Sequence, residues 1–391
     1  MKIKLSRRSF SQGMLNVAVS IGATIPLRSH SAWNLDWLGI SHESPKQEFW
    51  LSAQGRNQDQ YGLGWINPSD KNASRVSAPF RGHGLCQNPI QPEQVILFSR
   101  RPGTQGIRLN LGTEKIDTTF NSVNDRHMQG HGCFSPDGQI LYCAESEISS
   151  GKGKITLRDS KTLALIGEFD SHGIGPHEIA MMPDGDTLVI ANGGLLTHPD
   201  SGRTILNLES MRSSLTYINR HSGKLISEHY LLEPKASIRH IDVADDGSVA
   251  IALQVQRKAM DHHNLIPLAA VHMAGEEIKM LHAPAVLTTK LNDYMGSVKV
   301  NNQSRIAAFS SPKGNLVLFW HLDDLSLQGF HSFHDVCGLT VSQDNKHFVL
   351  SNSAGKIRQI NASTLKEDST RRLYFPNTHW DNHMLSATLA R

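Results

Sequence analysis

Several features that would assign the chain to a familiar class are scarce or missing. Cysteine occurs only four times in 391 residues and aromatic residues make up 6%, so this is not a small scaffold held together by disulfides. The apolar stretch of residues 14–27 is shorter than the roughly 20 residues of a membrane-spanning helix, which argues against a stable membrane anchor. No Gly-x-Ser-x-Gly nucleophile elbow is found. After residue 33 no segment has long helical periodicity.

The first 32 residues have the order of an export signal. A basic start contains the pair Arg7-Arg8, Phe10 follows it, and the uncharged apolar residues 14–27 come next. This order is typical of a signal peptide, and the arginine pair indicates the twin-arginine pathway. We therefore expect residues 1–32 to be removed and the mature chain, residues 33–391, to work in the periplasm.

The overall charge changes sign when this segment is set aside. The formal net charge is +3, and the five basic residues of the segment have no acidic counterparts there, so the mature chain has a net charge of −2. Nothing in this balance suggests binding to nucleic acid or to an anionic membrane surface. We expect a monomer.

A hairpin pattern repeats along the chain. His131-Gly-Cys-Phe-Ser-Pro-Asp-Gly begins a unit that recurs from His177 and from His240, each time as an apolar run, an Asp-Gly turn and a second apolar run. Such a pattern is typical of a tight β-hairpin. Further strands follow in each unit, and four antiparallel strands make a propeller blade. Weaker copies start at His83, near Tyr294 and at His334.

The two ends of the chain supply a seventh unit. Residues 379–389 resemble an inner strand without its three partners, and residues 48–53, 61–66 and 74–78 offer three strands without an inner one. We therefore predict an all-β, seven-bladed β-propeller over residues 33–391, closed by a blade built from both termini and free of exposed sheet edges. An eight-bladed ring or a pair of β-sandwiches is the alternative.

These features together resemble one known family. The arginine pair, the seven units and the segment Gly175-Pro-His-Glu-Ile-Ala-Met-Met-Pro-Asp-Gly are similar to twin-arginine-exported proteins with a seven-bladed, YVTN/WD40-like propeller, a domain of unknown function. Members are often encoded beside imelysin-like iron-uptake proteins. The resemblance therefore implies a role in periplasmic iron or metal handling, with iron-uptake proteins as partners, and it implies no catalytic residues.

Histidines recur at one position of the repeat. Inner strands of a propeller line its channel, so side chains at their starts are expected to meet around one mouth. Neutral imidazole is a common ligand of iron and copper, and neighbouring carboxylates can join such a site or orient its histidines. The sequence thus predicts candidate ligands for a transition metal, iron or copper, at His83, His131, His177, Glu178, His240, Asp242, His334, Asp335 and His383.

A structural role competes with this interpretation. Histidines near inner strands also hydrogen-bond neighbouring blades, and this role is favoured while the metal role stays open. Two functions follow: a non-catalytic binding or assembly module that holds a metal-containing ligand or an iron-uptake partner, and, as its rival, a metal-dependent oxidoreductase or a lactonase-type hydrolase. Ring nitrogens within about 4–5 Å of one another would favour a metal.

Two cysteines flank one of the hairpin turns. Cys133 and Cys143 lie almost symmetrically about residues 135–138, so they are candidates for a disulfide across the hairpin in an oxidising compartment. Two buried free thiols are the alternative, and both remain open.

Overall fold

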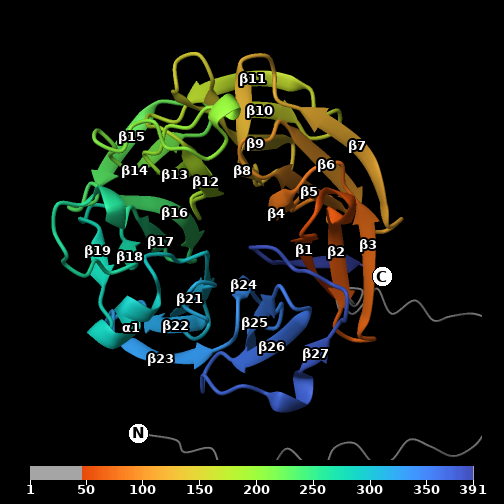
Figure 1. Cartoon of the computed structure of the whole chain (residues 1–391). Helices are drawn as coiled ribbons and strands as arrows, with labels where there is room; N and C mark the ends of the chain where they lie inside the picture. The colour runs from red at the N-terminus through yellow and green to blue at the C-terminus, as the bar shows by residue number, and fades with distance from the viewer. Residues whose placement is uncertain (1–45, 391) are drawn as a thin grey trace, which may run out of the picture. The chain divides into compact units, whose positions relative to one another are not determined.

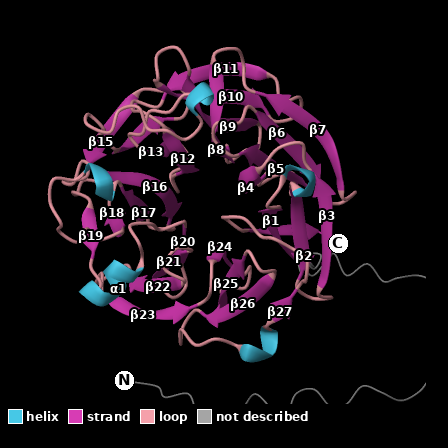
Figure 2. Cartoon of the chain, in the orientation of Figure 1, coloured by secondary structure: helices cyan, strands magenta, loops and turns pink. Residues whose placement is uncertain are grey.

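The architecture is a ring of seven four-stranded antiparallel sheets around a central channel (Figure 1). It is seen in a computed structural model that describes residues 46–390. The predicted signal, with Arg7 and Arg8, lies outside the described residues. Figure 2 shows that strands make up nearly all of the ring. The predicted seven-bladed propeller is therefore confirmed.

The sheets are named blades A to G, and their strands run from the channel outwards. Blade A consists of β28 (Leu385–Ala390), β1 (Lys46–Gln54), β2 (Gly62–Asn67) and β3 (Asn72–Ser77), and blade B of β4 (Gly82–Gln87), β5 (Gln94–Ser99), β6 (Gln105–Asn110) and β7 (Lys115–Asn121). Blade C consists of β8 (Arg126–Phe134), β9 (Ile140–Glu147), β10 (Gly153–Asp159) and β11 (Leu165–Asp170), and blade D of β12 (Pro176–Met181), β13 (Thr187–Asn192), β14 (Ser214–Asn219) and β15 (Leu225–Tyr230). Blade E consists of β16 (Ala236–Val243), β17 (Val249–Val255), β18 (Ala269–His272) and β19 (Lys279–Leu281), and blade F of β20 (Ser297–Asn301), β21 (Ile306–Ser311), β22 (Leu316–His321) and β23 (Leu327–Ser332). Blade G consists of β24 (Val336–Val341), β25 (His347–Asn352), β26 (Lys356–Asn361) and β27 (Leu373–Tyr374).

Helical elements in the described part of the chain are short. They are α1 (Ala285–Lys290) and the 3-10 turns η2 (Gln58–Gln60), η3 (Pro199–Ser201), η4 (Arg257–Ala259) and η5 (Ser369–Arg371). Within residues 46–390, no helix has the length and apolar character needed to cross a membrane.

The middle strands of each blade are buried on both faces. In β5 the consecutive residues Val95, Ile96, Leu97 and Phe98 are all fully buried, because one face packs on blade A and the other on blade C. The outer strands β7, β11 and β23 alternate between more and less exposed residues instead. Unbroken apolar runs therefore mark the middle of a blade, where burying one large apolar side chain contributes about 1.5–3 kcal/mol.

The predicted Asp-Gly turns join the first two strands of blades C, D and E. Gly138, Gly185 and Gly247 have φ angles of 66°, 72° and 86°, a region that glycine enters without steric cost. The preceding aspartate caps the turn: in blade D the side chain of Asp184 accepts the backbone N–H of Thr187 over 2.9 Å. The repeat found in the sequence is thus a real structural unit.

Both termini build blade A, as predicted. β28 from the end of the chain is the inner strand, and it pairs antiparallel with β1, with Phe49 opposite Ala387 and Leu51 opposite Leu385. β1 in turn pairs with β2. This ladder closes the ring by hydrogen bonds between residues more than 300 positions apart.

The cysteine pair of blade C does not form a disulfide. Cys143 lies opposite Gly132, whereas Cys133 lies opposite Tyr142. Neighbouring positions of a strand point to opposite faces of the sheet, so Cys143 packs towards blade B and Cys133 towards blade D. The two sulfur atoms cannot meet, and all four cysteines are free thiols; of the two alternatives left open by the sequence, the disulfide is wrong.

A matched pair of substitutions tests the closing strand. Ala387 is fully buried in β28, whereas Ala390 in the same strand is exposed. We expect Ala387→Asp to lower the free energy of unfolding by about 3 kcal/mol or more, because it buries an unpaired carboxyl group. Ala390→Asp should change it by no more than about 0.5 kcal/mol. Urea unfolding of both variants measures the difference, and equal midpoints would contradict the role of β28.

Candidate metal centre in the propeller channel

Bulges in the inner strands carry the histidines. The pairing register shifts once in each of β4, β8, β12 and β16. Each shift contains or adjoins one histidine: His83, His131, His177 and His240. A bulge bends its strand and redirects the side chains next to it. The segment that leads into β28 adds His383, so five consecutive inner strands each supply one imidazole.

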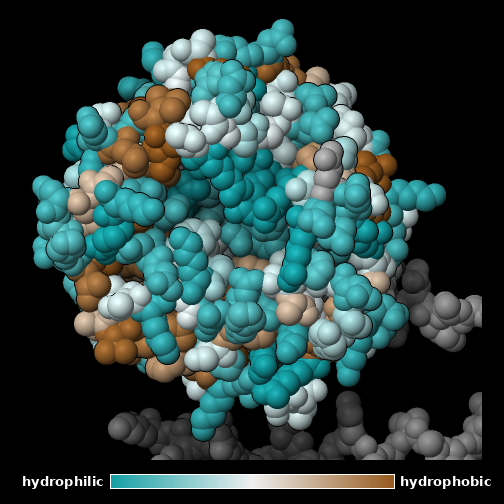
Figure 3. Space-filling view, viewed as in Figure 1, coloured by the Kyte–Doolittle hydropathy of each residue, from teal (hydrophilic) through white to brown (hydrophobic). Residues whose placement is uncertain are grey.

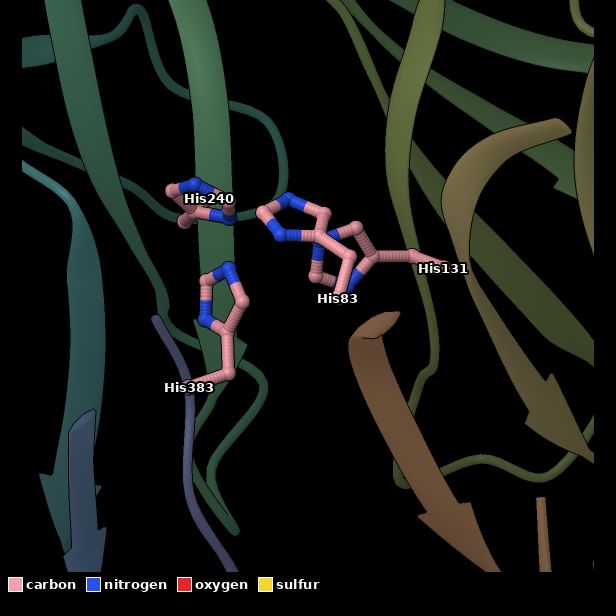
Figure 4. A group of neighbouring side chains, drawn as sticks. All are labelled: His83, His131, His240 and His383. Carbon is pink, nitrogen blue, oxygen red and sulfur yellow. The ribbon is translucent and has the colours of Figure 1, made fainter. Parts of the chain in front are cut away.

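These five side chains, the histidine cluster, pack against one another in the channel. All are at most 8% exposed, and in nine of their ten pairs the ring centroids lie between 4.3 and 5.9 Å apart. Four of them form a tighter group, here called the quartet, in which one ligand nitrogen of each residue lies within 4.8 Å of the others: His83, His131, His240 and His383. Figure 4 shows the four rings turned towards a common centre.

The quartet is close to the spacing that one metal ion requires. Four nitrogens bound tetrahedrally to one ion at about 2.0–2.1 Å lie about 3.4 Å apart. The widest separation in the quartet, within 4.8 Å, therefore has to close by no more than about 1.4 Å. Rotation of the imidazole side chains would bring the nitrogens to this spacing.

The hydrogen bonds of the cluster run between side chains and leave several ring nitrogens without a partner among the described residues. Among the described residues, no ring nitrogen of the five histidines bonds a backbone group of a neighbouring blade. Four nitrogens are buried without any partner: His83 Nδ1, His131 Nε2, His177 Nδ1 and His383 Nε2. A buried polar atom left unpaired costs about 1–3 kcal/mol, and native proteins rarely keep several in one place. A metal ion would use these lone pairs.

Glu178 orients two members of the quartet. His240 Nδ1 donates to Glu178 Oε2 over 3.0 Å, and the other carboxylate oxygen lies 3.3 Å from His131 Nδ1. The backbone N–H of Ile241 also donates to Oε2 over 3.0 Å. When a carboxylate accepts a hydrogen bond from Nδ1–H of an imidazole, the lone pair of that ring lies on Nε2, and this is the arrangement found around metal-bound histidines. Glu178 therefore acts behind the ligands rather than as one of them.

Burial favours the neutral form of three members of the quartet. Burial, reinforced by the neighbouring rings, lowers the pKa of His83 and His383 well below the usual range, and burial lowers the pKa of His240 to about 4 despite the contact with Glu178. Burial would raise the pKa of Glu178, but His131 and His240 outweigh it and hold this pKa well below its usual range. Neutral imidazoles with free lone pairs, backed by an ionised carboxylate, are the forms that bind a metal.

His177 stands beside the quartet. Its Nε2 lies 3.3 Å from Nε2 of His240, and because His240 carries its proton on Nδ1, His177 has to be the donor. A metal on His240 Nε2 would replace this hydrogen bond and free His177 to turn towards the ion. Ser297 holds His383 from the other side, with its hydroxyl 3.2 Å from His383 Nδ1. Sequence reasoning missed this serine, since blade F has no histidine to draw attention to its inner strand.

Three predicted site residues lie elsewhere. His334 is exposed in the turn before β24, and Asp335 hydrogen-bonds the hydroxyl of Ser353 there. The bulge of β24 instead contains Cys337 and Gly338, and Cys337 packs among apolar residues of blades A and G. His334 therefore comes too early in the chain to reach the cluster. Asp242 pairs with Lys299 over 2.6 Å between blades E and F. The predictions that these three residues belong to the metal site are wrong.

The channel opens beside the cluster. A cavity of about 410 Å³ is bordered by His83, His177 and His240. Figure 3 shows that the hollow at the centre of the visible face is lined by hydrophilic side chains. A small molecule can therefore approach the histidines from the channel.

A carboxylate substitution tests the geometry of the centre. We expect Glu178→Gln to weaken the binding of Zn²⁺ about 10- to 100-fold, because an amide has one acceptor oxygen and can accept a hydrogen bond from only one of the two histidines. Asp335→Asn, at a predicted site residue outside the cluster, should leave the affinity unchanged. Competition with a chromogenic chelator measures both constants, and equal affinities in the two variants would contradict the role given to Glu178.

Comparison with known proteins agrees with the fold. The profile of a family described as protein of unknown function (DUF1513) matches residues 76–387. A search of the curated proteins gave no match. Among solved structures, the chain is similar to hydrazine synthase of Kuenenia stuttgartiensis, with a TM-score of 0.58 and 14% identity over 74% of this chain and 86% of that one. At this identity the likeness concerns the fold alone.

Proposed function

Because the chain belongs to the DUF1513 family of proteins of unknown function, we propose its function from the channel: the propeller binds one transition-metal ion through the histidine quartet. The observation that carries this proposal is the convergence of four buried imidazoles, with ligand nitrogens within 4.8 Å of one another. Imidazole nitrogen suits iron, copper and zinc. Iron or copper is the metal we expect in the cell.

The chain acts as a binding module rather than as an enzyme. Four imidazoles complete the coordination of a tetrahedral ion, whereas catalytic sites keep one position open for water or substrate. The rival, a metal-dependent oxidoreductase or lactonase-type hydrolase, draws support from the cavity that borders the cluster. An exchangeable water on the bound metal, detected by spectroscopy of a Co²⁺-loaded sample, would favour the enzyme over the module.

Elemental analysis tests the metal site. We expect the purified protein to hold one transition-metal ion per chain and the double variant His131→Ala/His240→Ala to hold none, because both residues present Nε2 lone pairs to the centre. His334→Ala removes an exposed histidine and should keep full metal content. Thermal unfolding checks that each variant is folded, and a folded parent that holds no metal after growth or reconstitution with iron, copper or zinc would refute the proposal.

The protein does this work in the periplasm, in the service of iron uptake. Support comes from the twin-arginine pattern at Arg7-Arg8 and from the resemblance to proteins encoded beside imelysin-like iron-uptake proteins. Iron-uptake proteins of that compartment are the proposed partners.

Cell fractionation tests the location. We expect the parent chain in the periplasmic fraction and the variant Arg7→Lys/Arg8→Lys in the cytoplasm, because the export machinery recognises the arginine pair. The variant Lys2→Arg/Lys4→Arg keeps the pair and should still be exported. Equal export of all three chains would exclude the twin-arginine route.

A further inference from the structure

The cavity beside the histidine cluster is strongly basic. Its wall contains six cationic side chains, here called the cationic vestibule: Arg81, Arg100, Arg101, Arg203, Arg239 and Lys313. The wall contains a single carboxylate, that of Asp381. These residues come from different blades and from the long β13–β14 connection, so only the closed ring brings them together.

Asp381 neutralises only part of this charge. Its carboxylate accepts one hydrogen bond from Arg81 Nε over 2.7 Å and another from Arg100 Nη1 over 3.0 Å, and its side chain is almost fully buried. Both of its oxygens are thereby occupied. Within residues 46–390, no carboxylate forms an ion pair with Arg101, Arg203 or Arg239.

Among these three arginines, Arg239 gives the strongest evidence for a bound anion. It lies in the bulge of β16 next to His240, it is only 8% exposed, and it lines the cavity. Its Nε and Nη1 atoms are buried and have no hydrogen-bond partner in the described part of the chain. A buried guanidinium without a partner is strongly unfavourable unless an anion completes the site.

We propose that the cationic vestibule binds a small oxyanion with two or more negative charges, a polycarboxylate or a phosphate, held by Arg101, Arg203 and Arg239. Guanidinium groups form paired hydrogen bonds with both kinds of anion. A cavity of about 410 Å³ is within the range that holds a small ligand. None of these arginines is a member of the histidine quartet, so the proposed anion site does not require a bound metal.

Titration calorimetry on metal-free protein tests the site. The probes are citrate and inorganic phosphate, added to full mature chain that has been dialysed against a chelator. We expect saturable binding of one anion per chain, which weakens at high salt because the contacts are ionic. Tighter binding of citrate than of phosphate would identify a polycarboxylate as the ligand class, and the opposite order would identify a phosphate.

Substitutions locate the site. Arg239→Gln and Arg203→Gln should each weaken binding about tenfold or more, because each removes charged hydrogen bonds. Arg203 is exposed in a loop, so its variant tests the site even where the buried one fails to fold. Arg371→Gln changes an exposed arginine outside the cavity and should bind like the parent.

Two results would overturn the proposal. One is the absence of saturable binding of either probe to the folded parent, and the other is equal affinity in the parent and in Arg203→Gln and Arg239→Gln. The double variant His131→Ala/His383→Ala separates the two sites, because both residues belong to the quartet and neither lines the cavity. It should keep anion binding after losing the metal, so a failure of one proposal does not count against the other.

Discussion

The antiparallel pairing of β28 with β1 is the constraint on which the rest of the molecule depends. A propeller blade buries its faces only against two neighbours, so an open ring would expose an apolar face on each side of the gap. Pairing of residues 385–390 with residues 46–51 closes this gap. The same closure delivers His383 to the channel, where its ring lies 4.8 Å from that of His131. Both the stability of the ring and the assembly of the candidate site therefore depend on the pairing of β28 with β1.

Desolvation explains the chemical character of the channel. Imidazole can avoid the cost of a buried charge by losing its proton, and burial accordingly lowers the pKa of His83, His177, His240 and His383. A guanidinium group does not lose its proton near neutral pH, so the cationic vestibule keeps its positive charge. The channel thus places neutral lone-pair donors beside charged hydrogen-bond donors. A metal cation bound by the histidine quartet and an anion bound in the cationic vestibule would lie close together, and their opposite charges would attract each other.

The seven blades contribute unequally to this arrangement. Blades A to E each supply a histidine, four of them at a bulge of the inner strand. The inner strand of blade F pairs without a register shift and carries Ser297, while the bulge of blade G carries Cys337 and Gly338. The candidate metal centre therefore lies among the imidazoles of five blades, and Ser297 of blade F holds His383 by a hydrogen bond. A repeated fold has been made asymmetric by substitutions at one structural position.

Local features of the sequence determined the number of blades, the Asp-Gly turns, the closing blade and all five members of the histidine cluster. Such features depend on strand alternation and turn chemistry, which act between residues close in the chain. The position of the bulge in β24 left His334 outside the channel, and the pairing register kept Cys133 apart from Cys143. Only the tertiary structure decided these points and joined Arg101, Arg203 and Arg239 around one cavity, because that neighbourhood exists only when distant loops meet over a closed ring.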